Sequence, residues 1–315
     1  MTAVVVPSRR SRFADFRELS KSGIVFLVLI NVIGGYLIGQ PAEAPWDPMR
    51  LLWTLLGVFF LAAGSSALNQ LQEHRLDAEM PRTAGRPLPS GRISPVQALL
   101  FVAIFLALGL SILRWRVNEP VFWLGVAATL SYNGLYTLWW KKHWAYAAVP
   151  GAIPGALPVL MGFVAASGNL WHPGGIYLFA ILFYWQMPHF WVLALRYKED
   201  YSKGSFPTLP VAKGEGVTLH QIRLWCLGYI GLALIAPLFL KVGALYLLMT
   251  IPLCAKVLWE LRHFLRQAEA SDIAKPGNKA WLRFFLWINF SQMILIFAAA
   301  LDLWSLHIAT PLWVR

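Results

Sequence analysis

A short polar stretch between two apolar segments carries the residues whose types and spacing suit chemistry. Residues 69–92 read NQLQEHRLDAEMPRTAGRPLPSGR. Asn69, Glu73 and Asp77 are spaced four residues apart, so a helix that continues through them places all three on one face. Mg²⁺ is usually held by one or two carboxylates together with waters and the phosphate oxygens of a substrate. The spacing therefore predicts a magnesium site at the end of a helix.

The same stretch supplies cations that suit a phosphate. Arg82, Arg86 and Arg92 follow the acids, and a guanidinium group can hold a phosphate through two parallel hydrogen bonds. Acids for a metal beside arginines for a phosphate fit a diphosphate site. A plainer interpretation is also open, in which the stretch is a solvated helix end inside a loop that is basic for topological reasons.

A second acidic and basic loop follows a later apolar segment. Residues 196–218 contain the sequence YKEDY, in which Asp200 is the predicted metal ligand from the opposite side, with Glu199 beside it. Lys198 is a predicted catalytic cation of the same loop. A metal-bridged diphosphate needs ligands from two sides, so this loop favours the site over the plainer interpretation.

Three further residues have both a functional and a plain interpretation. Lys141 and Lys142 of the turn WKKH are either diphosphate ligands or ordinary lysines that set the topology. His189 lies inside an apolar segment, in WQMPHFW. An ionisable residue at such a place is a functional candidate, although a neutral histidine that only packs fits the sequence equally well.

Long apolar stretches must position these loops. The chain has 315 residues, of which 58% are hydrophobic and 13% are charged, and the charged share is about half that of an ordinary globular domain. Runs of about 20 apolar residues can cross a bilayer as helices, and lipid-exposed backbone must satisfy its own hydrogen bonds. We therefore predict an all-α membrane bundle of nine transmembrane helices. The predicted spans are 22–39, 51–69, 96–113, 120–139, 145–166, 174–195, 219–240, 242–260 and 284–303.

The distribution of basic residues predicts the orientation. The net charge is +12, and 22 of the 27 basic residues fall on one side when the N-terminus is cytoplasmic, as the positive-inside rule requires. Topology thus explains the charge, and no nucleic-acid partner is indicated. We expect a cytoplasmic tail over 1–21, the helical domain over 22–303, a C-terminal tail over 304–315 and an active site at the cytoplasmic side.

Other kinds of chemistry lack support. Cys226 and Cys254 fall within predicted spans and fit small buried residues. The chain contains no Walker motif, no GxSxG and no HExxH, so NTP hydrolysis and proteolysis are not indicated.

Several segments resemble the UbiA-type intramembrane prenyltransferases. Residues 69–92 resemble the first acidic motif of that superfamily, and more narrowly its haem branch, the protohaem IX farnesyltransferases, with the form N-x₃-E-x₃-D-x₂-M-x-RT-x₂-RPL-x₂-GR. SYNGLYTLWWKKH, PGAIPGALPVLMGFVAASG and WQMPHFWVLALRYKEDYSKGSFPTLPV are similar to three further segments of that branch. Many members of the superfamily have a second D-x₃-D motif, whereas here Arg196 stands four residues before Asp200.

The resemblance implies a reaction and its surroundings. Farnesyl diphosphate, haem b and water would give haem O and diphosphate, with Mg²⁺ as the cofactor. The implied location is the inner (plasma) membrane of a bacterium, among membrane lipid, with a haem A synthase or an oxidase assembly factor as a further partner.

The implied residue roles follow from matching positions. The implied metal ligands are Asn69, Glu73, Asp77 and Asp200, and the implied diphosphate ligands are Arg82, Arg86, Arg92, Lys141 and Lys142. Lys198 is implied as a further catalytic residue. The implied residues that stabilise the allylic cation are Tyr132, Tyr136 and Tyr197, and His189 is implied to contact haem.

Three rival interpretations stay open. The acceptor could be another aromatic compound or tetrapyrrole, the acidic loops could gate a transporter, or the chain could bind haem without catalysis. The charges lie at the ends of the predicted spans and not at their middle, which disfavours a transporter.

Overall fold

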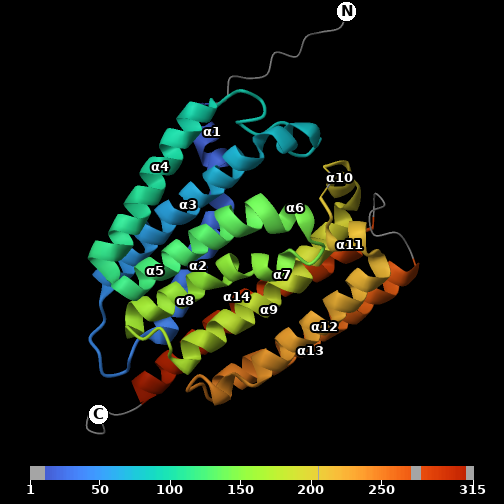
Figure 1. Ribbon diagram of the computed structural model, residues 1–315. Coiled ribbons are helices and arrows are strands. Elements are labelled where there is room, and N and C mark those ends of the chain that lie inside the picture. Colours follow the sequence, from blue (N-terminus) through green and yellow to red (C-terminus); the bar gives the residue numbers. More distant parts are fainter. Residues whose placement is uncertain (1–10, 205, 271–277, 310–315) are drawn as a thin grey trace, which may run out of the picture.

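The structure is a computed structural model that describes residues 11–204, 206–270 and 278–309, and within these ranges it is built from helices without strands (Figure 1). The helices are α1 Arg12–Leu19, α2 Ser22–Gly39, α3 Pro48–Glu79, α4 Pro95–Ile112, η1 Leu113–Val117, α5 Glu119–Thr129, η2 Leu130–Trp140, α6 Lys141–His143, α7 Ala148–Gly151, α8 Ile153–Ser167, α9 Pro173–Arg196, α10 Lys198–Lys203, α11 Leu209–Ala212, α12 Glu215–Leu234, η3 Ala236–Leu238, α13 Ala244–Ala270 and α14 Ala280–Ala309.

The predicted all-helical membrane bundle is confirmed, but the count of nine spans is not. Eight helical segments of the described chain are long and apolar enough to cross a membrane. The predicted span 120–139 corresponds to α5 followed directly by η2, which are separate and shorter. Helix α1 and the end of α14 lie at opposite ends of the bundle (Figure 1), which agrees with an odd number of crossings. The exact count and the orientation stay predictions.

Local sequence signals fix where the helices next to the polar stretch begin. Helix α3 starts at Pro48, and the Asp47 side chain accepts a hydrogen bond of 2.8 Å from the backbone of Arg50. Helix α4 starts with a capping box, in which Ser94 and Gln97 each cap the backbone of the other. These caps define a helical hairpin, α3–α4, with residues 80–94 as its connection at one end of the bundle.

Glycines allow the central helices to pack closely. A Cβ at Gly35 of α2 would collide with the backbone of Val159, and one at Gly162 of α8 would collide with the backbone of Val32. Small residues that let two helix backbones touch are typical of membrane bundles. Helices α2 and α8 thus form a rigid pair near the centre, against which the other helices pack.

One segment departs from α-helical geometry. Residues 130–140 form a π-helix, η2, that leads directly into α6. Within η2 the hydroxyl of Thr137 donates a 2.8 Å hydrogen bond to the backbone carbonyl of Tyr132, five residues earlier. π-helical turns are rare and often occur at functional sites.

The predicted element boundaries needed several corrections. The fifth span, expected over 145–166, is divided into α7 and α8, which each contain a proline, whereas the internal Pro188 leaves α9 unbroken. The interval between the predicted spans 242–260 and 284–303 is shorter in the structure, because α13 continues to Ala270 and α14 begins at Ala280. Residues 12–19 of the expected tail form a helix, α1. Helix α14 continues to Ala309, into the expected C-terminal tail. Residues 1–10 and 310–315 of the two expected tails lie outside the described residues.

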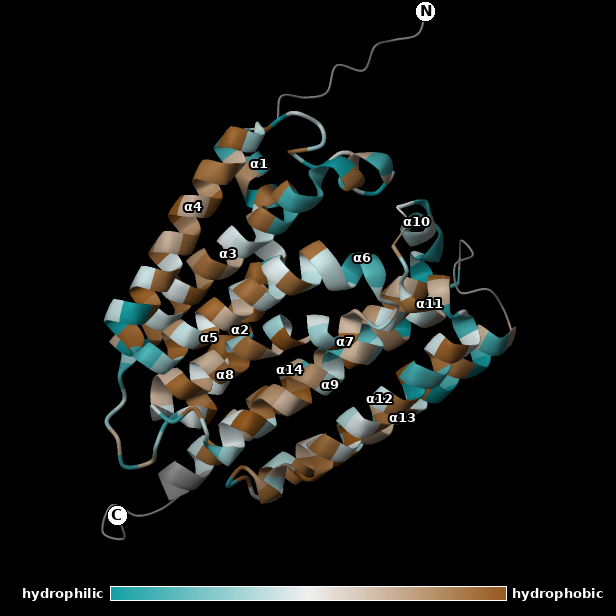
Figure 2. Cartoon of the chain, viewed as in Figure 1, coloured by the Kyte–Doolittle hydropathy of each residue, from teal (hydrophilic) through white to brown (hydrophobic). Residues whose placement is uncertain are grey.

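Polar residues gather at one end of the bundle. In Figure 2 the hydrophilic colour is concentrated around α6, α10 and the connection after α3, while the middle parts of the long helices are mostly hydrophobic. The predicted acidic loops therefore lie at helix ends.

Candidate active site

The acidic face predicted for residues 69–77 is present as a helical face. Helix α3 continues through the whole stretch to Glu79. The side chains of Asn69, Glu73 and Asp77 are buried, with 4%, 3% and 2% of each residue exposed, whereas Arg75 is exposed. Burial of two carboxylates at the end of a membrane-length helix is costly unless each has a partner. That cost separates this stretch from a solvated helix end.

Each buried carboxylate is paired with a cation from a different element. Lys141, the first residue of α6, donates hydrogen bonds of 2.7 and 2.9 Å to the two carboxylate oxygens of Glu73. Arg86 donates one of 2.6 Å to Oδ2 of Asp77. Both cations have about a fifth of their side chains exposed, 22% in each case. Lys141 and Arg86 therefore lie where their charges can also reach a ligand from the solvent side.

The connection after α3 folds back to bring Arg86 over Asp77. The Thr83 hydroxyl donates a 2.8 Å hydrogen bond to the backbone carbonyl of Asp77, and the backbone N–H of Arg86 donates one of 3.0 Å to the carbonyl of Thr83. Pro87 and Leu88 next to it are buried. The RTxxRPL sequence thus forms a fixed turn.

Asn69 connects three elements. Its Oδ1 accepts a 2.9 Å hydrogen bond from Nζ of Lys21, and its Nδ2 donates one of 3.2 Å to the hydroxyl of Thr137 in η2. Both ends of the Asn69 amide are therefore engaged within the protein. As a metal ligand it would have to exchange the Lys21 contact for the ion.

The second loop packs over the same end of α3. The Arg82 guanidinium lies 5.5 Å from the ring centre of Tyr197, and Nζ of Lys141 lies 4.6 Å from that of Phe206. A Cβ added at Gly204 would stand 2.9 Å from Sδ of Met80. Helix α10, which carries Asp200, thus begins and ends beside the first acidic motif.

Asp200 itself is held less firmly than the first two acids. It is half-buried on α10, and its carboxylate forms no ion pair or hydrogen bond with the described ranges. Glu199 beside it is exposed. Among the residues that the structure describes, no group of three or more His, Cys, Asp or Glu side chains is clustered tightly enough to hold a metal by itself.

The tyrosines divide into two groups. The rings of Tyr132 and Tyr136 in η2 stack at 6.1 Å with an interplanar angle of 14°. Thr137, the residue next to Tyr136, accepts a hydrogen bond from Asn69, so this pair borders the acidic face. Tyr197 differs, because guanidinium groups of Arg82 and Arg196 already lie 5.5 and 5.8 Å from its ring centre.

Two predicted cations are engaged elsewhere. The Arg92 guanidinium forms ion pairs of 2.8 Å with Asp15 and 3.2 Å with Glu18, both in α1. Lys198 forms one of 2.8 Å with Glu215 at the start of α12. Because of these ion pairs, the side chains of Arg92 and Lys198 do not lie beside Glu73 and Asp77. Lys142 is half-buried next to Lys141.

His189 lies apart from the acidic face. Its ring packs against Trp185 and Phe285, with ring centres 5.0 and 4.9 Å away, so it faces α14. Its Nδ1 is buried without a hydrogen-bond partner of normal geometry, and the Asn289 side chain lies close enough to interact with the ring. Buried polar atoms are usually satisfied, so this nitrogen is available to a ligand.

Comparison with known proteins decides the family. Residues 28–309 match the model of the UbiA prenyltransferase family. This chain belongs to that family. The UbiA-family chain is 43% identical over 290 residues to a Bdellovibrio bacteriovorus protein named Protoheme IX farnesyltransferase, covering 92% of this chain and 96% of that protein. It is 39% identical over 237 residues to an Aquifex aeolicus protein of the same name, covering 75% and 80%.

Solved structures share the fold of this UbiA-family chain. A structure of digeranylgeranylglyceryl phosphate synthase is similar with a TM-score of 0.73 and 21% identity, covering 92% of this chain and 98% of that one. A UbiA homolog from Archaeoglobus fulgidus bound to DMAPP and Mg2+ is similar with a TM-score of 0.64 and 18% identity, covering 91% and 99%.

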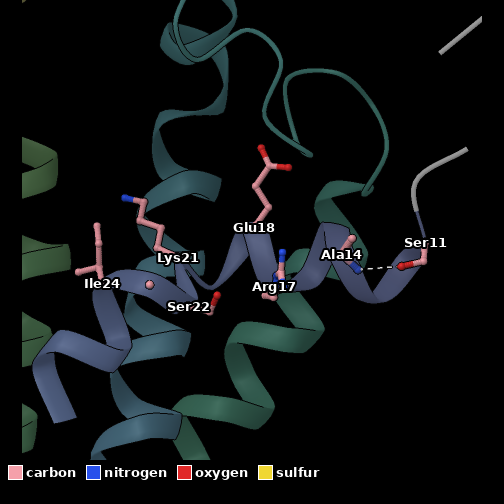
Figure 3. A pocket seen from close by; sticks show the side chains of 8 residues that line it. Ser11, Ala14, Arg17, Glu18, Lys21, Ser22 and Ile24 are labelled. Atoms are coloured by element: carbon pink, nitrogen blue, oxygen red, sulfur yellow. Dashed lines mark hydrogen bonds between the residues drawn. The ribbon is translucent and has the colours of Figure 1, made fainter. Parts of the chain in front are cut away.

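Sequence reasoning missed Lys21. It precedes α2 with φ 50° and ψ 48°, the one positive φ of a non-glycine residue in the described chain, and such a conformation is uncommon for lysine. Burial, and then the positive charges of Arg86 and Lys141, lower the pKa of Lys21 to about 8. Figure 3 shows its side chain at a pocket of about 680 Å³ that Arg17, Glu18 and Ile24 also line. Lys21 looked like one more basic residue of the N-terminal tail, so only its tertiary contact with Asn69 distinguishes it.

Proposed function

We propose that this UbiA-family chain transfers a farnesyl group from farnesyl diphosphate to a vinyl group of haem b, with addition of water, and so makes haem O. Two relatives that cover most of the chain carry the name of this activity. The observation that carries the proposal is the pair of buried carboxylates, Glu73 and Asp77, each held by a cation that reaches the site from another element. Such an arrangement suits a metal-bound diphosphate.

The donor set fits Mg²⁺. Glu73 and Asp77 provide two carboxylates on one helical face, and Asp200 of the adjoining loop provides a third that has no partner in the described ranges. Mg²⁺ prefers oxygen ligands and completes its shell with water and phosphate oxygens, so a cluster of three protein acids is not required. When bound there, the ion would offset negative charge on the departing diphosphate.

The cations of the chain would bind the diphosphate. Arg86 and Lys141 would exchange their contacts with Asp77 and Glu73 for phosphate oxygens, and Arg82 and Lys142 would approach from the solvent side. Lys21, which now donates to the neutral Asn69 amide, would be a further cation. Charge-assisted hydrogen bonds that strengthen as negative charge develops on the leaving group lower the barrier for its departure.

The reaction balances without a protein nucleophile. The bond between C1 of the farnesyl group and its oxygen breaks, and the electron pair leaves with diphosphate. The π electrons of the vinyl group form the new carbon–carbon bond. Water adds to the resulting cation and loses a proton to solvent. The stacked faces of Tyr132 and Tyr136 would stabilise the allylic cation, and Nδ1 of His189 would contact haem.

Product analysis tests the proposal directly. The purified chain in detergent is incubated with haem b, farnesyl diphosphate and Mg²⁺, and the porphyrins are identified by mass spectrometry. We expect haem that has gained one farnesyl group and one hydroxyl group, together with diphosphate. Prenylation of another aromatic compound or tetrapyrrole with no haem product would refute the proposed acceptor and leave prenyl transfer standing.

We also propose that the site faces the cytoplasm of a bacterium, from the inner membrane, with the N-terminus inside. The distribution of 22 of 27 basic residues supports this orientation. Single cysteines in 168–174 and in 196–218 should react with impermeant reagents from opposite sides, while the buried Cys226 and Cys254 stay silent. Labelling of both loops from the same side would overturn the orientation.

A further inference from the structure

Helices α12 and α13 enclose a groove at the edge of the bundle, away from the acidic face. Its volume is about 310 Å³, and the two helices run side by side along the outside of the molecule (Figure 1). Arg223 and Leu227 of α12 line one wall, and Leu258, Arg262 and Arg266 of α13 line the other. No residue of the groove belongs to the site described above.

The lining changes from charged to apolar along the groove. On α13, Arg266, Arg262 and Leu258 succeed one another four residues apart, so they form one stripe along a helix face. On α12, Arg223 and Leu227 have the same spacing. Because α12 and α13 are antiparallel neighbours in the chain, both helices place their arginines toward the same end and their leucines toward the middle of the bundle.

This gradient matches the depth of a membrane. Arg262 and Arg266 lie just beyond the end of the apolar stretch 242–260, and Arg223 lies four residues inside the start of 219–240. The arginines therefore stand at the level of lipid headgroups, and Leu227 and Leu258 stand at the level of the acyl chains.

The arginines of the groove form no ion pair with the residues that the structure describes. On another face of α13 the cations are paired: Lys256 and Arg283 both form ion pairs with the buried Glu260, at 2.9 and 3.1 Å. Arg223, Arg262 and Arg266, in contrast, are exposed and form no ion pair with an acid of the described chain. Glu269 at the outer end leaves the groove with an excess of positive charge.

We propose that this groove binds a phospholipid with an anionic headgroup, whose phosphate contacts the arginines and whose acyl chain lies along the leucines. Basic pockets between transmembrane helices at the cytoplasmic side favour such lipids, and guanidinium groups bind phosphate with two hydrogen bonds. The proposal does not depend on the reaction at the acidic face.

Native mass spectrometry of the full chain in detergent tests the groove. The protein is titrated with phosphatidylglycerol and, separately, with phosphatidylcholine, and the bound fraction gives the affinity. The double variant Arg262→Gln with Arg266→Gln should weaken phosphatidylglycerol binding about 30-fold, at about five-fold for each cation removed near a membrane surface. The control variant Arg75→Gln with Lys213→Gln removes two other exposed cations and should bind like the wild type.

The remaining arms separate the alternatives. Inorganic phosphate should not displace the lipid at millimolar concentration, and phosphatidylcholine should bind weakly to all variants alike. Equal phosphatidylglycerol affinity in the wild type and the double variant would overturn the proposal, and so would inorganic phosphate that binds as tightly as the lipid. If size-exclusion chromatography shows that the double variant does not fold, Arg223→Gln alone provides the test, with about a five-fold loss expected.

Discussion

The two acidic halves of the candidate site differ in how firmly the fold holds them. Glu73 and Asp77 are buried at the end of a 32-residue helix, and each has its own ion pair. Asp200 is half-buried on the six-residue helix α10, and its carboxylate has no ion pair or hydrogen bond with the described part of the chain.

This difference separates two uses of a carboxylate. The first half is part of the packed fold, because two carboxylates buried at a helix end need partners that offset the cost of their desolvation. The second half adds little to that packing and is suited to complete its contacts when a ligand arrives. Loss of either half should stop the reaction. Only loss of the first half should also lower the free energy of unfolding.

Removal of the divalent cation should have the largest effect on activity, since it affects both halves. EDTA should abolish farnesyl transfer by the wild type, and added Mg²⁺ should restore it, because both halves of the acidic site are proposed to act through the ion. Product formation is measured by mass spectrometry, and circular dichroism checks that the helices persist. Full activity after exhaustive chelation would disprove the metal role.

Asp77→Asn and Asp200→Asn distinguish the halves. Each should lower kcat/KM about 100- to 1000-fold, the usual cost of losing one stabilising group for a developing charge. Asp77→Asn should also lower the free energy of unfolding by about 3 kcal/mol, because it breaks a mostly buried ion pair. Thermal unfolding in detergent measures this. Equal destabilisation by Asp200→Asn would remove the distinction drawn between the halves.

Arg86→Ala and His189→Phe should separate the two substrates. Arg86→Ala should raise the KM for farnesyl diphosphate about 10- to 100-fold, because it removes a charge-assisted hydrogen bond, and should leave haem affinity unchanged. His189→Phe keeps the aromatic packing and removes Nδ1, so it should weaken only haem binding. Kinetics with each substrate varied, together with haem titration by absorbance, gives the answer. Weaker haem binding in Arg86→Ala would instead indicate contact with haem propionates.

Lys21→Met should have a smaller effect on the same substrate. The change removes the ammonium group and keeps most of the apolar stem, so we expect farnesyl diphosphate affinity to fall about tenfold. Lys21→Arg should recover part of it. Arg17→Met is the matched control from the same pocket and should behave like the wild type. A loss of stability with unchanged affinity in Lys21→Met would make Lys21 a purely structural residue.

Arg92→Ala should have the smallest effect. Its partners Asp15 and Glu18 lie in α1, and 29% of its side chain is exposed, so the loss should be about 1 kcal/mol or less of stability. The effect on farnesyl diphosphate should be indirect and a few-fold at most. In a double-mutant cycle, Arg92→Ala and Asp15→Asn should be non-additive. A 100-fold rise in KM for the diphosphate substrate would restore Arg92 as a direct ligand.

Periodic features of the molecule were readable from the sequence. The four-residue spacing predicted the helical face of Asn69, Glu73 and Asp77, which the structure confirms as a shared buried face of α3. The apolar runs predicted most of the membrane-length helices. These features depend on local periodicity and hydropathy, which the sequence carries directly.

Features that depend on distant pairings were not readable. Helix α1 is short and polar, and its place is fixed by Gln70, which donates hydrogen bonds of 3.0 and 2.9 Å to the backbone carbonyls of Glu18 and Leu19. The same contacts orient Lys21. Arg92 is indistinguishable from Arg86 by residue type and motif, and only the fold shows that one faces Asp77 and the other faces α1.

The π-helix η2 limits which mutations its own segment can accept during evolution, because the number of its residues matters. Helix η2 leads directly into α6 and so sets the direction in which Lys141 points. Deletion of a single residue between 130 and 140 would therefore turn Lys141 away from Glu73, even if every site residue were kept. Substitutions on the outer face, such as at the exposed Leu135 and Leu138, would leave the position of Lys141 unchanged. Insertions and deletions should therefore be far rarer here among descendants of this chain than substitutions are, and a one-residue gap would mark a lineage that has lost or rebuilt the site.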